Sequence, residues 1–229
     1  MIFKQLFDPE SFTYTYLLAC PTTKEAIIID PVIEFVDSYT DLLKNDHLSL
    51  KYILDTHVHA DHITGAGTLR DLTGAQSAMS EISKTDCIDI RLKDNDILKF
   101  GKYTLKALYT PGHTSCHLTY QVDNLLFTGD CLFINGCGRT DFQGGSAADQ
   151  WESVVNKLYQ MPQDYLVYPG HDYKNHHVSC IAQEIKLNPR FKNKTKESFI
   201  EYMDKLDLPD PKKINEAVPA NEACGVLKT

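Results

Sequence analysis

The sequence predicts an α/β protein with the architecture of a four-layer αββα sandwich. The first observation is the strand-like pattern of residues 2–30, where "FTYTYLLAC" alternates and "EAIIID" is a short apolar run. The second is another strand-rich stretch in residues 96–130. The third is helical sequence that follows each of these stretches. Two strand-rich halves with helices at both ends favour two packed sheets covered by helices on their outer faces.

The first half contains three strands, a helix, a fourth strand and a second helix. Residues 2–30 supply the three strands, and the last of them ends at Asp30-Pro31. Residues 33–46 carry apolar side chains at Ile33, Val36, Leu42 and Leu43, which suits an amphipathic helix. "KYILDT" is a buried strand, and "HITGAGTLRDLTG" is the loop and helix that follow it.

The second half repeats this order of strands, helix and strand. "DILKFGKYTLKALYTPGHTSCHLTYQVDNLLFTGD" is strand-rich with tight turns, residues 146–160 are helical, and "YLVYPGH" is a strand. Residues 174–206 read as helical, and the Pro-rich segment beyond them is expected to be loosely structured. We therefore expect one domain over residues 1–229, with a short helical C-terminal extension from about residue 174.

Composition narrows the class of protein. The chain has 229 residues and a formal net charge of −8, which argues against a nucleic-acid binder that needs a basic face. No apolar run approaches the roughly 20 residues that span a bilayer, and the N-terminus resembles neither a signal nor a transit peptide. Seven scattered cysteines without a Cys-x-x-Cys pair predict free thiols, a reducing compartment and a cytoplasmic location.

Seven polar side chains at the ends of predicted strands carry the chemistry. Five of the nine histidines belong to this set, whose members are His57, His59, Asp61, His62, His113, Asp130 and His171. Each member follows an apolar run and lies beside a glycine or in a loop. If those runs are neighbouring strands, all seven side chains can meet in one cleft. Imidazole and carboxylate together suit a divalent transition metal such as zinc, iron or manganese.

The spacing of the cluster in "THVHADH" has a mechanical reason. His57 and His59 project to the same side because side chains alternate along an extended chain, and Asp61 and His62 begin the next turn. A lone histidine in a glycine turn, such as His113 or His171, is more often a turn or surface residue. Asp130 could simply close a turn. The H-x-H-x-D-H cluster is different, and with the other three residues in order it predicts a metal site.

The motifs "THVHADH", "PGHT", "TGD" and "PGHD", in this order, resemble the metallo-β-lactamase superfamily. The resemblance implies an αββα fold with metals at the edge of the sandwich. That superfamily includes lactamases, glyoxalase II, lactonases, nucleases and flavoprotein oxygen reductases, so these motifs leave the reaction open.

Further motifs resemble one family within it, the persulfide dioxygenases, also called ethylmalonic-encephalopathy-type sulfur dioxygenases. They are "FTGDCLFINGCGRTDFQGG", "YPGHDY", "LNPR" and "AVPANEACG", and the similarity runs from Phe12 almost to the C-terminus. The resemblance implies an oxidoreductase that uses one non-haem Fe(II) per chain. It converts glutathione persulfide and O2, with water, to sulfite and glutathione. Dimers are common in the family, so a homodimer is compatible with the sequence.

The number of potential ligands implies a site for two metals, whereas the family resemblance implies a site for one. The residues alone offer ligands for two metals: His57, His59, His113 and Asp130 around one, with Asp61, His62, Asp130 and His171 around the other. The resemblance implies a single iron on His57, His113 and Asp130, a two-histidine, one-carboxylate triad with open positions. His59, Asp61, His62 and His171 then orient the ligands and bound water, or form a second metal site that stays vacant.

Three further residues are candidates for the substrate side of the site. Arg139 could bind a carboxylate of glutathione, because guanidinium matches carboxylate geometry. Tyr173 could donate to the substrate sulfur or to bound oxygen, and Asp172 is expected to hold the ligand loop. In the alternative interpretations Arg139 braces its own loop and Tyr173 is a packing residue.

Two other functions compete with persulfide oxidation. A glyoxalase II-like hydrolase (a dinuclear metal hydroxyacylglutathione thioesterase) shares the ligand set and a glutathione-bearing substrate. Glyoxalase II resembles the first part of the chain but adds a larger helical domain, whereas the segment after Tyr173 is short here. A metal-bound sensor or partner-binding protein is the non-enzymatic alternative, and the complete ligand set argues against it.

Overall fold

The computed structural model describes residues 1–211 and 213–225, which form two six-stranded mixed sheets. The first sheet follows chain order, with β1–β3 antiparallel and β3–β6 parallel. Its strands are β1 (Ile2–Phe7), β2 (Tyr14–Ala19), β3 (Glu25–Ile29), β4 (Ser49–Leu54), β5 (Gln76–Ser80) and β6 (Ile90–Leu92).

The second sheet has the order β12-β11-β10-β9-β8-β7, and only the pair of β10 and β11 is parallel. Its strands are β7 (Ile97–Phe100), β8 (Tyr103–Tyr109), β9 (Leu118–Val122), β10 (Leu125–Gly129), β11 (Leu166–Pro169) and β12 (Ser179–Cys180). The parallel pair needs a crossover connection, which the helical segment after residue 146 provides.

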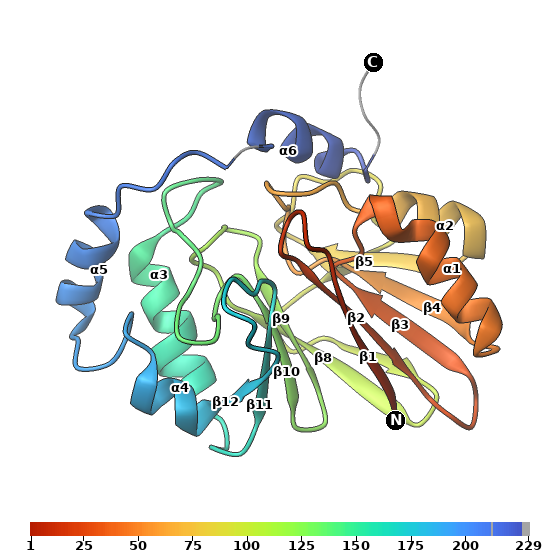
Figure 1. Cartoon of the computed structure of the whole chain (residues 1–229), viewed down its shortest axis with the longest axis horizontal. Coiled ribbons are helices and arrows are strands. Elements are labelled where there is room, and N and C mark those ends of the chain that lie inside the picture. Colours follow the sequence, from red (N-terminus) through yellow and green to blue (C-terminus); the bar gives the residue numbers. More distant parts are fainter. Residues whose placement is uncertain (212, 226–229) are drawn as a thin grey trace.

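Helices cover the outer face of each sheet (Figure 1). A 3-10 turn (Ile33–Phe35), α1 (Val36–Asn45) and α2 (Ala66–Thr73) pack on the first sheet. On the second lie α3 (Ala147–Trp151), its π-helical (Glu152–Lys157) and 3-10 (Leu158–Gln160) continuation, α4 (Ile181–Leu187) and α5 (Lys196–Asp204). The predicted αββα sandwich is therefore confirmed.

Strand β2 shows why its sequence suits this architecture. Tyr14, Tyr16 and Leu18 join the core between the two sheets, while Leu17 and Ala19 join the core under α1 and α2. Side chains of a strand alternate between faces, and both faces of this strand are covered. The apolar run "YLLA" is consequently buried throughout.

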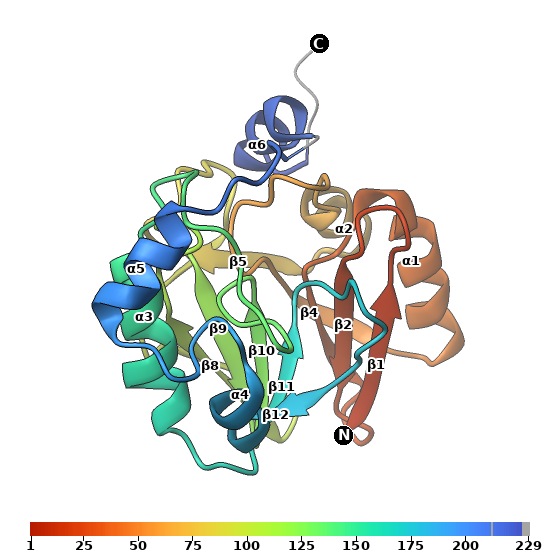
Figure 2. The same ribbon diagram turned by 60° about the vertical axis from the view of Figure 1, so that its left-hand side comes forward.

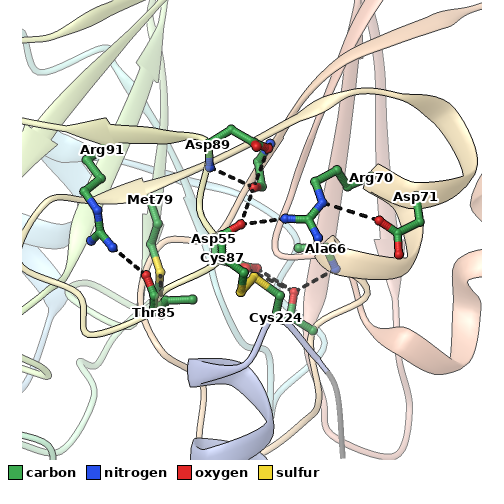
Figure 3. The surroundings of a disulfide bond; sticks show 12 residues. Asp55, Ala66, Arg70, Asp71, Met79, Thr85, Cys87, Asp89, Arg91 and Cys224 are labelled. Atoms are coloured by element: carbon green, nitrogen blue, oxygen red, sulfur yellow. Dashed lines mark hydrogen bonds and ion pairs between the residues drawn. A yellow bond between two sulfur atoms is a disulfide. The ribbon is translucent and has the colours of Figure 1, made fainter.

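Two predictions made from the sequence are wrong. The segment after residue 206 is not simply loose, because Ile214–Glu222 forms helix α6 with Pro219 inside it. Both views place α6 over the loops at one end of the sheets (Figure 1 and Figure 2). The prediction of free thiols fails for Cys87 and Cys224, which form a disulfide (Figure 3), whereas the other five cysteines are not disulfide-bonded. The two cysteines are 137 positions apart in the chain, so no local pattern indicated the pair.

No helix within residues 1–211 and 213–225 is long and apolar enough to cross a membrane.

Candidate metal centre

The two sheets are joined at the end where the polar side chains gather. The Leu118 amide donates to the Thr56 carbonyl across 2.8 Å, which ties the start of β9 to the loop after β4. The Tyr14 amide donates to the Gly170 carbonyl, also at 2.8 Å, which ties β2 to the end of β11. These backbone bonds bring the loops that follow β4, β8, β10 and β11 together, as the sequence analysis expected.

A first group consists of His57, His113 and Asp130, whose candidate ligand atoms all lie within 4.8 Å of one another. His113 Nε2 lies 3.5 Å from Asp130 Oδ2. The Nδ1–H of His113 donates to the Arg139 carbonyl at 2.7 Å, because a carbonyl oxygen can only accept. The lone pair of His113 Nε2 therefore faces Asp130. A histidine whose other nitrogen is held in this way is oriented for a metal.

His57 is oriented by a relay of hydrogen bonds that begins at Asp30. The Thr56 hydroxyl donates to Asp30 Oδ2 at 3.0 Å, so its oxygen is free to accept from His57 Nδ1, 2.9 Å away. The proton of His57 is thereby placed on Nδ1, which leaves the Nε2 lone pair for a metal. Asp30 also accepts from the Thr56 amide at 2.7 Å.

A second group consists of His59, Asp61 and His62, again with candidate ligand atoms within 4.8 Å. His59 Nε2 donates to Asp30 Oδ1 at 3.0 Å, and His62 Nδ1 lies 2.9 Å from Asp61 Oδ2. His171 joins the two groups, since its Nε2 lies 3.5 Å from Asp61 Oδ2 and 3.4 Å from Asp130 Oδ1. All seven residues predicted from the sequence therefore lie in one cluster.

The unpartnered atoms of this cluster fit a metal. His59 Nδ1, His62 Nε2 and Asp130 Oδ1 are buried and have no hydrogen-bond partner among the described residues. Buried polar atoms nearly always have a partner, so such atoms call for an ion or an ordered water. Neutral imidazole and carboxylate are the donor types that zinc, iron and manganese accept. The chain thus has a histidine and aspartate metal-binding site.

The charges in the cluster shift its pKa values in different directions. Burial and the neighbouring imidazoles lower the pKa of His57 well below its usual range, which keeps it neutral, as a metal ligand must be. Burial also opposes the protonation of His59, but the Asp30 carboxylate outweighs it and raises the pKa of His59 to about 10, so a metal at His59 Nδ1 must displace a proton. For Asp61, the charges of His62 and His171 outweigh burial and lower the pKa.

A cavity of about 600 Å³ opens onto this cluster. His113, Asp130 and His171 line its floor together with Asp61. Its walls come from the loop of residues 133–139, from the loop of residues 172–176 and from the C-terminal residues Leu208, Pro209 and Pro211. A space of this size is sufficient for a small peptide-like ligand.

Arg139 and Tyr173 both line the cavity, but neither is free of protein contacts. The Arg139 guanidinium binds Asp141 through Nε at 2.6 Å and Nη2 at 2.7 Å, and donates from Nη1 to the Pro209 carbonyl at 2.6 Å. The Tyr173 ring stacks on His171 with centroids 5.8 Å apart, yet 63% of the residue stays exposed.

Asp172 contacts both its own loop and the N-terminal part of the chain. One carboxylate oxygen accepts from the Lys174 amide at 2.7 Å, and the other accepts from the Tyr14 hydroxyl at 3.0 Å. The Asp172 amide donates to the Phe12 carbonyl at 3.1 Å. The loop after His171 is therefore fastened to the N-terminal strands.

Three residues of the site were not found by sequence reasoning. Asp30 looked like the end of a strand, although it orients Thr56 and His59. His117, four positions after His113, accepts from the amides of Asp130 at 3.1 Å and Cys131 at 3.3 Å, and so places the Asp130 carboxylate. Asn221 lies in "AVPAN", a motif that only the resemblance had singled out.

Comparison with known proteins agrees with this geometry. The model of the metallo-beta-lactamase superfamily matches residues 8–89 and 86–171, and the chain belongs to that superfamily. The chain is 44% identical to persulfide dioxygenase ETHE1 of Homo sapiens over 99% of its own length and 89% of that protein. Within the superfamily it is therefore a member of the persulfide dioxygenase family.

A solved structure and a more distant relative place this assignment in context. The crystal structure of ETHE1 from Myxococcus xanthus superposes with a TM-score of 0.97 at 46% identity, covering 99% of this chain and 100% of that one. A hydroxyacylglutathione hydrolase of a Polaromonas species is 34% identical over 80% of this chain and 72% of that protein. The hydrolase that served as the alternative in the sequence analysis is thus a relative, but a more distant one.

Proposed function

We propose that this member of the persulfide dioxygenase family oxidises glutathione persulfide with O2 and water to glutathione and sulfite, at a single ferrous iron. His57, His113 and Asp130 hold the iron in this proposal. The convergence of these three side chains within 4.8 Å is the observation that carries it. The family assignment supports the reaction class.

His57, His113 and Asp130 would hold the iron, and two of them, His113 and Asp130, also line the cavity. Two histidines and one carboxylate with open positions are the arrangement that oxygen-activating ferrous enzymes use. A ferrous ion bound there supplies redox chemistry that zinc does not have. His113, Asp130 and His171 line the cavity, so a persulfide bound in the cavity would lie beside the residues that would hold the iron.

The remaining residues of the cluster orient the ligands in this proposal. Asp30 and Thr56 fix the ring of His57, and the Arg139 carbonyl fixes that of His113. His171 lies between Asp61 and Asp130 and can hold bound water or substrate against the carboxylates. Such groups outside the ligand set typically change metal affinity or activity about 10- to 100-fold.

Arg139 and Tyr173 are the proposed contacts to glutathione. Both face the cavity, and the Tyr173 hydroxyl belongs to an exposed side chain that a ligand can cover. The guanidinium of Arg139 is engaged by Asp141, so a substrate carboxylate must compete with that ion pair or use the remaining N–H.

The second candidate function, a dinuclear thioester hydrolase, rests on one specific observation. The unpartnered atoms His59 Nδ1, His62 Nε2 and Asp130 Oδ1 belong mostly to the second group, where a second metal would bind. Two metals would serve to generate hydroxide for attack on a carbonyl.

One experiment separates the two functions. The protein is purified without oxygen, iron and zinc per chain are measured, and oxygen uptake with glutathione persulfide is followed. Iron near one per chain with persulfide-dependent uptake is expected. Two zinc ions per chain, no uptake and rapid thioester cleavage would refute the proposal.

Two variants sharpen the result. Asp130→Ala removes a carboxylate of the first group and is expected to abolish iron binding. His171→Ala removes a residue that lies 3.4 Å from Asp130 outside the proposed triad, and is expected to retain iron. Loss of iron in both variants would favour a dinuclear site.

A further inference from the structure

The side chain of Asn221, in helix α6, binds the backbone of the metal loop. Its Nδ2 donates to the carbonyl of His59 at 2.9 Å and to the carbonyl of His62 at 2.8 Å. Its Oδ1 accepts from the Thr64 amide at 2.8 Å. Asn221 is buried, so all three bonds are shielded from water. One carboxamide therefore closes the loop that carries His59, Asp61 and His62.

The noncovalent packing that holds α6 against this loop is small. Ala217 and Ala220 contact Ile63, and Val218 packs near Val58. Alanine side chains bury little apolar area, so this packing alone stabilises the helix only modestly. Close backbone contact makes up for it in part, because a Cβ on Gly67 would collide with the Cys224 carbonyl.

The disulfide joins the end of α6 to a well-anchored part of the sandwich. Cys224 lies three positions after Asn221, and its partner Cys87 lies in the loop between β5 and β6 (Figure 3). The Arg70 guanidinium donates to the Cys87 carbonyl at 2.6 Å, and Asp89 accepts from the Ser77 amide at 2.8 Å. The bond thus links the end of the C-terminal helix to a loop that is itself hydrogen-bonded to α2 and β5.

The segment that leads into α6 also forms one wall of the cavity. Leu208, Pro209 and Pro211 line the cavity, and Arg139 donates to the carbonyl of Pro209. A displacement of α6 would therefore reach the metal loop through Asn221 and the cavity through this wall.

We propose that Asn221 is a positioning residue for the metal loop. In the same proposal the Cys87–Cys224 disulfide is a thiol-reducible crosslink that holds α6, and with it Asn221, against that loop. The proposal rests on the proposed metal site but not on the identity of the metal or on the persulfide reaction. When the disulfide is reduced, α6 keeps its noncovalent contacts but loses its covalent link to the loop between β5 and β6. The three bonds of Asn221 then open more often, and bound metal leaves faster.

The reductant is a low-molecular-weight thiol. Its thiolate attacks the sulfur of Cys87, which is half-buried whereas Cys224 is buried, and Cys224 leaves as a thiolate that takes up a proton. A second thiol then releases Cys87 from the mixed disulfide. Two thiols are oxidised to one external disulfide, and two cysteine thiols form. A disulfide exposed to such thiols is reversible, so its state would follow the thiol concentration around the protein.

The first test compares two identical substitutions in the same helix. Asn221→Asp removes the donor to the two carbonyls, whereas Asn215→Asp changes an exposed residue of α6. The full chain is loaded with zinc or iron, and transfer of the metal to a coloured chelator is timed. We expect release about 10- to 100-fold faster from Asn221→Asp and unchanged from Asn215→Asp. Release at the wild-type rate from Asn221→Asp would overturn the positioning role.

The second test separates the disulfide from the asparagine. We expect 2-mercaptoethanol to speed metal release from the wild type and from Cys180→Ser, in which a cysteine outside the disulfide is changed. Cys87→Ser should release metal quickly with or without the thiol. Because this variant has no disulfide to reduce, it also shows whether the thiol speeds release by binding the metal itself. Labelling of free cysteines and mass spectrometry report the state of the bond. Equal rates of metal release before and after complete reduction of the disulfide would overturn its proposed role.

The results that would refute this inference can be distinguished from those that would refute the proposed function. A chain that binds metal but consumes no oxygen with persulfide would refute the reaction and leave this inference standing. A chain that binds metal normally and is insensitive to both Asn221→Asp and reduction would refute only the inference.

Discussion

Asp30→Asn is expected to weaken metal binding without touching a metal ligand. The Asp30 carboxylate accepts three hydrogen bonds, from the Thr56 amide, the Thr56 hydroxyl and His59 Nε2. A carboxamide cannot accept all three. In the wild type, the Thr56 amide and His59 both donate to Asp30 Oδ1. The single oxygen of an asparagine must take that position, so its NH2 group faces the Thr56 hydroxyl.

That orientation changes the protonation of His57. The Thr56 hydroxyl can no longer donate to residue 30, and the remaining acceptor beside it is His57 Nδ1, at 2.9 Å. His57 would then carry its proton on Nε2, the nitrogen proposed to face the metal. We expect metal affinity to fall about 10- to 100-fold, as for other groups that orient metal ligands. Loss of the ionised partner of His59 should cost about 1.5–3 kcal/mol of unfolding free energy.

Two measurements check this prediction. Metal affinity is obtained by competition with a chelator, and unfolding free energy by urea titration of the metal-free protein. Asp37→Asn, an exposed position in α1, serves as the matched control and should change neither quantity. An affinity for Asp30→Asn within twofold of the wild type would show that the relay through Thr56 does not set the His57 tautomer.

Three further outcomes concern stability. Burial raises the pKa of Glu184 above its ordinary 4.5, so its protonated form favours the folded state, and that contribution is lost as the pH rises through the folded pKa. Urea titrations should therefore show the wild type losing stability relative to Glu184→Gln as the pH rises above 4.5, and a constant difference would contradict the sign. Tyr120→Phe leaves the Asp55 carbonyl without its 2.7 Å donor and should cost about 1–3 kcal/mol in urea, whereas the partly exposed Tyr103→Phe should cost little. Zinc at about one hundred times its Kd should raise the unfolding free energy by about 2.7 kcal/mol, a gain that a chelator removes, and no gain would mean that the folded state holds no ion.

The metal cluster could be predicted because its residues follow a local rule. His57, His59, Asp61 and His62 are consecutive enough to be read as one group, and each of the others ends an apolar strand. The strand ends of neighbouring strands meet at one edge, so the order of motifs was sufficient to predict that the seven residues converge. The resemblance to the persulfide dioxygenases, carried by "GCGRTDFQGG" and "AVPAN", supplied the reaction class that the cluster itself left open.

The residues that orient the cluster could not be read in this way. Asp30 and His59 are 29 positions apart, and Asn221 and His59 are 162 apart. Nothing in the neighbourhood of an aspartate before a proline, or of an asparagine in a short helix, indicates which carbonyl or imidazole it will meet. The same holds for Cys87 and Cys224, whose sulfur atoms meet only because α6 folds back over the loop between β5 and β6.

The sequence by itself determined the αββα architecture, the presence of a metal site and the seven polar side chains that gather in one cluster. The alternation of apolar and polar side chains along strands is a local property, and so is the clustering of imidazole and carboxylate groups. Such properties can be recognised in a short stretch of sequence. Only the tertiary structure decided how those side chains are held: by Asp30 through Thr56, by His117 behind Asp130, and by Asn221 on a helix that a disulfide links to the β5–β6 loop. Hydrogen bonds of this kind depend on atoms brought to within about 3 Å by the packing of distant segments, which no stretch of sequence specifies alone.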